Sequence, residues 1–179
     1  MTSLRTLTAL AAAAMVSLSA APAAFANTTP VGSSGGTPSA NICLLAFDCT
    51  YVNYKHGQPT DVVKHTGTLV NWSLNAGSVG GQVQLRVLRP LGHGRFTFVH
   101  SSSVQTVTAT GENTFGAHIK VKAGDVLALS DASSGLYMAS APAGTCVRYF
   151  DSSVPDGWSG KPDQNAPQLH LLLSANITP

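Results

Sequence analysis

The feature that most constrains the fold of this chain is an alternation of apolar and polar residues with a period of two. It is clearest near the end of the chain, where every second residue is apolar: Leu169, Leu171, Leu173, Ala175 and Ile177. Successive side chains of an extended strand point to opposite faces, so this pattern places all five on one face. No long run after the first 26 residues keeps the period of 3.6 that a helix requires. The pattern therefore predicts β-strands and essentially no long helix.

Similar short runs recur about every ten residues, separated by clusters of Gly, Pro, Asn and Ser, which is typical of all-β sandwiches and barrels. We expect an all-β fold, a two-sheet antiparallel sandwich of about eight to ten strands that buries the apolar face of each sheet against the other. The expected strands span residues 49–54, 68–75, 82–89, 95–101, 104–109, 118–121, 125–130, 136–139, 146–150 and 168–177.

The two ends of the expected domain are set by composition. Residues 1–26 resemble an export signal, with Arg5 near the start, an apolar run over 7–18 and the small-x-small sequence Ala24-Phe25-Ala26. The run is too short to span a membrane, which takes about 20 apolar residues. We therefore expect a secreted, extracellular protein without a membrane span. Residues 27–44, rich in Ser, Thr, Gly and Pro, are expected to form a flexible linker before a single β-sandwich domain over 45–179.

The chain has three cysteines, Cys43, Cys49 and Cys146. An oxidising extracellular setting permits a disulfide, and three cysteines allow three pairings, each of which leaves one thiol unpaired. We favour a Cys43–Cys49 disulfide, because two cysteines so close in sequence can close a small loop. It would attach the linker to the first strand, and Cys146 would remain as a buried thiol.

One short segment, Ala123-Gly124-Asp125, allows two interpretations. It lies between two apolar runs, and Gly-Asp occurs both in phosphate-binding loops and in hairpin turns. A phosphate-binding loop also needs more glycines, a Lys-Ser or Lys-Thr pair and a following helix, none of which the sequence shows here. Gly124 permits a positive φ, and the Asp125 side chain can bond to nearby backbone amides. The segment therefore predicts a hairpin turn.

Several stretches together resemble a group of uncharacterised secreted bacterial β-sandwich domains, and more loosely jelly-roll modules, including carbohydrate-binding modules and trimeric complement-type jelly rolls. The resemblance covers roughly residues 45–177 and implies a jelly-roll-like fold. It carries no active site that could be transferred to this chain. The stretches are GTLVNW at 67–72, LRVLRP at 85–90, Phe96 to Val99, and V-x-A-G-D-x-L-x-L from Val121 to Leu129.

Charge and motifs argue against several functional classes. Charged residues make up 10% of the chain, against about 25% in an average soluble protein. No basic stripe is present, so we expect no nucleic-acid binding. Glu112 is the one glutamate, and the six histidines form no HxH or HxxxH pair. We therefore expect a protein that is not an enzyme, with a hydrolase as the less favoured alternative.

The longest irregular segment of the expected domain, residues 150–165, holds the candidate site. Long loops in compact domains are often functional. We interpret Trp158 as a platform for a sugar ring, with Asp156 and Asn165 as polar ligand contacts. Asp151, Asp156 and Asp163 supply the oxygen ligands of a possible structural calcium ion, the one cofactor we consider. The alternative is a Pro-Gly-rich crossover whose Trp158 packs against the sandwich edge.

Export, low charge and this loop together indicate a non-enzymatic secreted β-sandwich protein that binds an extracellular polysaccharide or a cell-surface component. A second hypothesis is a structural, self-assembling extracellular protein, such as a jelly-roll oligomer. The two differ in the surface that they use: a ligand site needs a cavity or platform, whereas self-assembly needs a face or an edge strand complementary to another copy.

Overall fold

The computed structural model describes residues 27–42, 49–132, 135–152 and 154–179. These residues form fifteen β-strands and no helix, so no helix in this part of the chain could cross a membrane. Nine strands span five residues or more, in line with the expected number. The strands are β1 (Thr29–Ser33), β2 (Cys49–Lys55), β3 (Gln58–Pro59), β4 (Gly67–Ala76), β5 (Gln82–Gly92), β6 (Arg95–Ser101), β7 (Gln105–Thr106), β8 (Gly111–Val121), β9 (Val126–Asp131), β10 (Met138–Ser140), β11 (Thr145–Phe150), β12 (Ser159–Gly160), β13 (Gln164–Pro167), β14 (Leu169–Leu171) and β15 (Leu173–Thr178).

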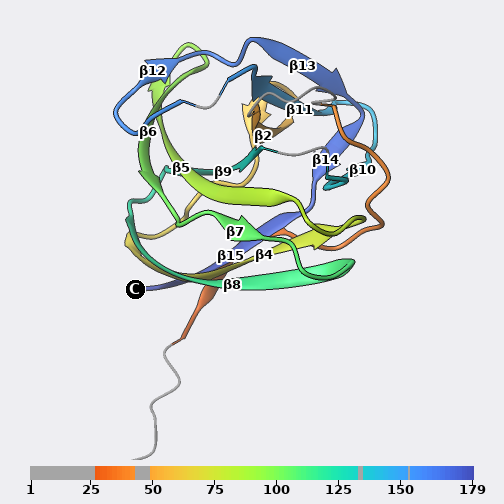
Figure 1. Cartoon of the computed structure of the whole chain (residues 1–179). Coiled ribbons are helices and arrows are strands. Elements are labelled where there is room, and N and C mark those ends of the chain that lie inside the picture. The colour runs from red at the N-terminus through yellow and green to blue at the C-terminus, as the bar shows by residue number, and fades with distance from the viewer. Residues whose placement is uncertain (1–26, 43–48, 133–134, 153) are drawn as a thin grey trace, which may run out of the picture.

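The strands form two main antiparallel sheets, which confirms the predicted all-β sandwich. One sheet has the order β1-β15-β4-β8. The larger sheet runs β12-β6-β5-β9-β2-β11-β13, with β3 paired to β2 and β7 paired to β5, and β10 and β14 form a separate two-stranded ribbon. In Figure 1, β8, β4 and β15 lie together as one layer, while β5 and β6 curve away from that layer, so the larger sheet is strongly curled.

The larger sheet buries both of its faces. Along β9, Leu127 and Leu129 belong to the first core, which lies between the two sheets, whereas Val126 and Ala128 belong to a second core on the opposite face. The first core also contains Trp72, which is fully buried, as its alternation with apolar neighbours predicts. The second core is rich in aromatic residues and includes Tyr54, Phe96, Phe98, Phe150 and Val154. The curl of the sheet thus creates a second interior.

Strand β1 lies within the segment that the sequence predicts to be a flexible linker. It pairs with β15 at the edge of the four-stranded sheet, with Val31 opposite Ala175. Val31 is 5% exposed and packs in the first core. Burying this one valine and pairing its backbone stabilise a strand that the surrounding Ser, Gly and Pro residues do not suggest.

A tight turn before β9 is confirmed, but the predicted hairpin is wrong, because β8 pairs with β4 in one sheet while β9 pairs with β5 and β2 in the other. Gly124 has a φ of 91°, and Asp125 N donates to the Lys122 carbonyl oxygen at 3.0 Å. The Asp125 carboxylate accepts from Lys122 N at 2.8 Å and pairs with both Arg89 Nε at 2.9 Å and Arg89 Nη2 at 3.1 Å. This hydrogen bonding raises the pKa of Arg89. The buried Asp125 therefore closes its own turn and connects it to β5.

Some predicted strand boundaries are wrong. In place of the expected strand over 104–109, only β7 is extended and paired, and the strand expected over 118–121 begins as early as Gly111. The run over 168–177 is divided into β14 and β15. The division falls at Leu172, whose backbone N–H donates to the Tyr137 carbonyl oxygen instead of joining the ladder of β15.

Candidate functional site

Trp158, the predicted sugar platform, packs mainly against the second core. Its ring makes edge-to-face contacts with Phe98 and Phe150, each at a centroid distance of 5.8 Å. A Cβ on Gly160 would lie 1.9 Å from the indole, so the ring also covers the backbone of β12. With 39% of the residue exposed, Trp158 stabilises the loop, and a role for it in ligand binding stays a prediction.

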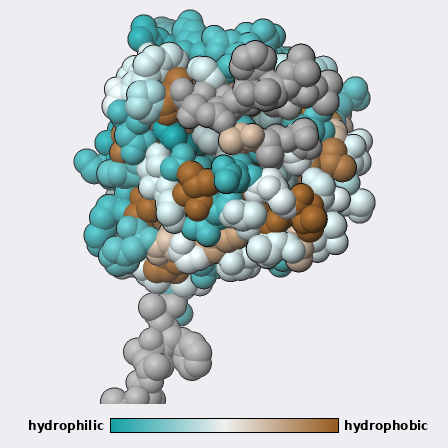
Figure 2. All heavy atoms as spheres, viewed as in Figure 1, coloured by the Kyte–Doolittle hydropathy of each residue, from teal (hydrophilic) through white to brown (hydrophobic). Residues whose placement is uncertain are grey.

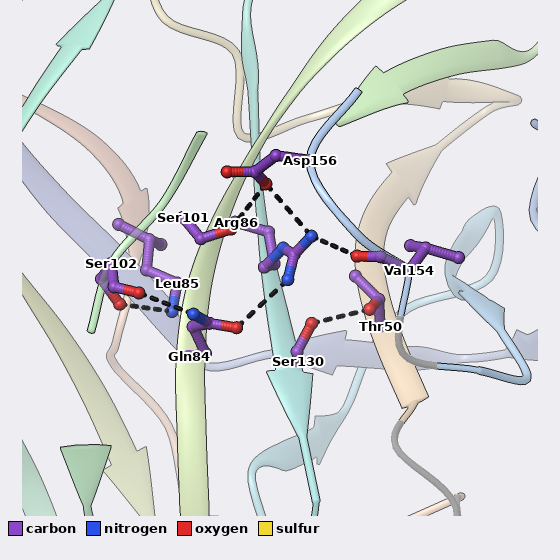
Figure 3. A network of polar contacts seen from close by, with 9 residues as sticks. All are labelled: Thr50, Gln84, Leu85, Arg86, Ser101, Ser102, Ser130, Val154 and Asp156. Carbon is purple, nitrogen blue, oxygen red and sulfur yellow. Dashed lines mark hydrogen bonds and ion pairs between the residues drawn. The ribbon is translucent and has the colours of Figure 1, made fainter. Parts of the chain in front are cut away.

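Asp156 takes part in a hydrogen-bond network around the buried Arg86 of β5 (Figure 3). Its Oδ1 atom accepts from Ser101 Oγ at 2.7 Å and lies 3.3 Å from Arg86 Nη2. Arg86 also donates to the Val154 carbonyl oxygen and, at 3.1 Å, to Gln84 Oε1. Burial lowers the pKa of Arg86, an effect that the Asp156 charge opposes. The network holds the 154–158 segment over the second core, so Asp156 has a structural role in positioning this segment.

The remaining predicted ligands are exposed and do not assemble with Asp156. Asp163 Oδ2 accepts from the backbone N–H of Asp151 at 3.2 Å, and Gln164 Nε2 donates to Asp151 Oδ2 at 3.2 Å. Asn165 is an exposed residue of β13, opposite Arg148 on β11. Among the described residues, no group of three His, Cys, Asp or Glu could hold a metal ion. The ligand set expected for calcium is therefore not brought together.

Cys146 is half-buried in β11 and carries a free thiol, which leaves Cys43–Cys49 as the one pairing compatible with the structure. Cys43 lies outside the described residues, so this disulfide stays a prediction.

A cavity of about 470 Å³ that the sequence does not reveal lies at the end of the four-stranded sheet where β1 meets the β2–β3 hairpin. One wall is the backbone of β1, and another is formed by Ala141, Pro142 and Thr145. Its lining contains the side chains of Lys55, Asp61, Lys64 and His170. Four separate segments of the chain thus contribute to one polar cavity.

Asp61 is the buried acid of this cavity. It is 3% exposed, and its Oδ2 accepts from Asn53 Nδ2 at 2.8 Å while its Oδ1 accepts from Thr60 Oγ1 at 3.1 Å. Burial raises the pKa of Asp61, and the bonds from Asn53 and Thr60 and the nearby His170 oppose that rise. A carboxylate has about four acceptor positions, so these two hydrogen bonds do not use all of them.

Asn53 is the residue that orients Asp61. It is buried on β2, where its Oδ1 accepts from Leu171 N at 2.7 Å and its Nδ2 donates to the Leu171 carbonyl oxygen at 2.9 Å. These two hydrogen bonds take the place of backbone hydrogen bonds between β2 and β14, and they fix the orientation of the Asn53 side-chain amide. The Asp61 backbone is held as well, because its carbonyl oxygen accepts from Leu127 N at 2.9 Å. The position of the acid is therefore set before any ligand binds.

The rim of the cavity is positively charged. Lys55 and Lys64 are exposed, and neither ammonium group has a hydrogen bond or ion pair with any residue that the structure describes. Asp61 is the one carboxylate in the described lining. Glycoside cleavage usually requires two carboxylates across the bond, and the described lining supplies one.

Sequence reasoning missed this site because none of its residues belongs to a motif. Asp61 precedes Val62-Val63, and His170 stands between Leu169 and Leu171 as an ordinary polar position of an alternating strand. The one available signal was Asn53, a polar residue inside the strand 49–54. A buried polar residue needs hydrogen-bond partners, and those partners lead to Asp61.

Comparisons with protein-family models, with curated proteins and with solved structures found no match for this chain.

Proposed function

We propose that this chain is an exported, non-enzymatic protein that binds an acidic extracellular polysaccharide in the cavity beside Asp61. The observation that carries the proposal is the pairing of a fixed, buried acceptor with two unpaired ammonium groups at the mouth of the same cavity. Asp61 accepts a hydrogen bond from a hydroxyl group of the sugar. Lys55 and Lys64 form ion pairs with the carboxylate or sulfate groups of the polysaccharide.

The remaining lining supports a hydroxylated ligand. Thr60, Thr145 and His170 add polar groups, whereas no Phe, Tyr or Trp is among the described residues of the lining. On the face shown in Figure 2, hydrophobic residues are scattered singly among hydrophilic ones and do not form a continuous patch. That face therefore shows no large apolar patch of the kind that marks a protein or membrane interaction site.

The test is calorimetric titration of the processed protein with polygalacturonate, dextran sulfate and neutral dextran. We expect binding to the two polyanions and none to dextran. Each of Lys55→Ala and Lys64→Ala should weaken binding about fivefold, because one exposed ion pair contributes about 1 kcal/mol. Lys120→Ala, which removes an exposed lysine from β8, the edge strand opposite β1 in the four-stranded sheet, is the matched control and should bind like the wild type.

Two results would overturn the proposal. One is equal binding to dextran, which would show that charge plays no part. The other is release of reducing sugar ends during prolonged incubation with either polyanion, which would show cleavage instead of binding. Self-assembly into an oligomer, the second hypothesis from the sequence, stays a prediction. Light scattering of the same samples measures the oligomeric state.

A further inference from the structure

A second cavity, of about 260 Å³, lies on the other side of the β2–β3 hairpin. Lys55 and Thr60 line the first cavity, whereas their chain neighbours Tyr54 and Pro59 line the second. Adjacent residues of a strand point to opposite faces, so the hairpin forms a wall with one cavity on each side. Its far wall is the β5–β6 hairpin around His93.

The second cavity has an aromatic floor and a positively charged rim. The rings of Tyr54 and Phe96 meet edge to face at 6.5 Å, and both residues are 1% exposed. His93 and Arg95 are exposed at the rim, and no acidic residue lines the described part of the cavity. Arg95 makes no hydrogen bond or ion pair with the described residues.

Tyr54 is held firmly in the floor of this cavity. Burial raises the pKa of Tyr54, and the Arg148 guanidinium, which lies 4.5 Å from the centroid of its ring, opposes that rise. The aromatic floor is therefore in place before any ligand binds.

The rim is also preformed. His93 has a φ of 52°, an unfavourable backbone conformation for a residue with a side chain, and the flanking Gly92 and Gly94 have φ values of 81° and 72°. His93 and Gly94 form the two-residue loop between the paired Gly92 and Arg95, and a positive φ at both positions is what such a hairpin turn requires. The imidazole is therefore displayed at the tip of a constrained hairpin.

We propose that the second cavity is a further subsite for the same polyanion, so that the protein binds several consecutive acidic sugar units across the β2–β3 hairpin. This inference rests on the proposed function. One unit occupies the cavity beside Asp61, the chain passes over the hairpin at Gly57 and Gln58, and a later unit places its acidic group on Arg95 and a ring face near Tyr54.

The test compares chain lengths. Oligogalacturonates of two and six units are titrated into the wild type, Arg95→Ala, Arg95→Lys and Lys64→Ala, with Lys120→Ala as the control. Wild type should bind the hexasaccharide more than tenfold more tightly than the disaccharide, because a second linked contact gains from high effective concentration. Arg95→Ala should weaken hexasaccharide binding about fivefold and leave disaccharide binding unchanged, and Arg95→Lys should restore most of the loss.

Lys64→Ala should weaken binding of both lengths. If Arg95→Ala affects neither length while Lys64→Ala weakens both, the second subsite is excluded and the proposed function stands. If Arg95→Ala weakens both lengths equally, the two cavities are not successive subsites, and the inference is again overturned. If the wild type binds neither length, nor polygalacturonate, nor dextran sulfate, the proposed function itself is excluded.

Discussion

Asn53 Nδ2 donates one hydrogen bond of 2.8 Å to Asp61 Oδ2 and another of 2.9 Å to the Leu171 carbonyl oxygen. A single buried amide thus connects the acid of the main cavity to the backbone of β14. His170, which lines the same cavity, precedes Leu171 on that strand. The orientation of the acid and the position of the imidazole therefore depend on the same side chain.

Replacement of Asn53 by alanine should lower the free energy of unfolding by about 3 kcal/mol, because it leaves the buried N–H and C=O of Leu171 and one oxygen of Asp61 without partners. Chemical denaturation measures this loss. Asn75→Ala is the matched control, since Asn75 Nδ2 makes one exposed bond of 2.7 Å to the Gly36 carbonyl oxygen, and it should cost less than about 1 kcal/mol. Equal losses in the two variants would contradict the role given to Asn53.

The stability contributed by Asp61 should depend on pH in a defined direction. Because burial raises its pKa above the ordinary value of 3.8, the folded chain keeps this proton to a higher pH than the unfolded chain. Its contribution is therefore fully present below pH 3.8, is lost as the pH rises through the raised pKa, and then stays constant.

Asp61→Asn lacks this titration and keeps an oxygen for the Asn53 amide. The stability of Asp61→Asn relative to wild type should therefore increase as the pH rises from about 3 to about 7. Urea denaturation at a series of pH values measures the difference in the free energy of unfolding between the two proteins. The contributions of the other carboxylates are nearly the same in both and largely cancel. A relative stability that falls over this range would mean that the fold prefers the charged acid.

The alternation of apolar residues was sufficient to predict the sandwich, because burial on one face of a strand is a local property of the sequence. Leu173, Ala175 and Ile177 do lie in the first core. The same reasoning could not find the second core, since β9 is buried on both faces, and it could not find β1, whose one buried residue is Val31. His170 reaches Lys55 and Asp61 through the contact of Asn53 with Leu171, 118 residues apart in the chain, which the spacing of residues along the chain does not encode.

Removal of the Arg86 side chain should loosen the segment that carries Trp158. Arg86→Ala should cost about 2–4 kcal/mol, because Val154 O, Gln84 and Asp156 lose their shared partner. Trp72 is fully buried, so an increase in acrylamide quenching of tryptophan fluorescence reports on Trp158. Asp156→Asn, at a side chain that is 48% exposed, should cost less than about 1 kcal/mol. Unchanged quenching in Arg86→Ala would show that the segment is held by other contacts.

Position 124 requires glycine because of its backbone conformation, and not because a larger side chain would lack room. Its φ is 91°, and no atom lies within 4 Å of the position a Cβ would take. Gly124→Ala should therefore cost about 1 kcal/mol or more through strain alone. Gly116 on β8 has equal space and no positive φ, so Gly116→Ala should be neutral or slightly stabilising. Thermal unfolding of both variants checks the contrast, and a neutral Gly124→Ala would contradict it.

The most direct test of the central claim is an NMR titration of the isotope-labelled, processed protein with a galacturonate hexasaccharide. We predict amide shift changes concentrated at Lys55, Thr60, Asp61, Lys64 and His170, with no comparable changes around Trp158. Changes centred on residues 154–165, or an unchanged spectrum at saturating sugar, would contradict the assignment of binding to the cavity beside Asp61.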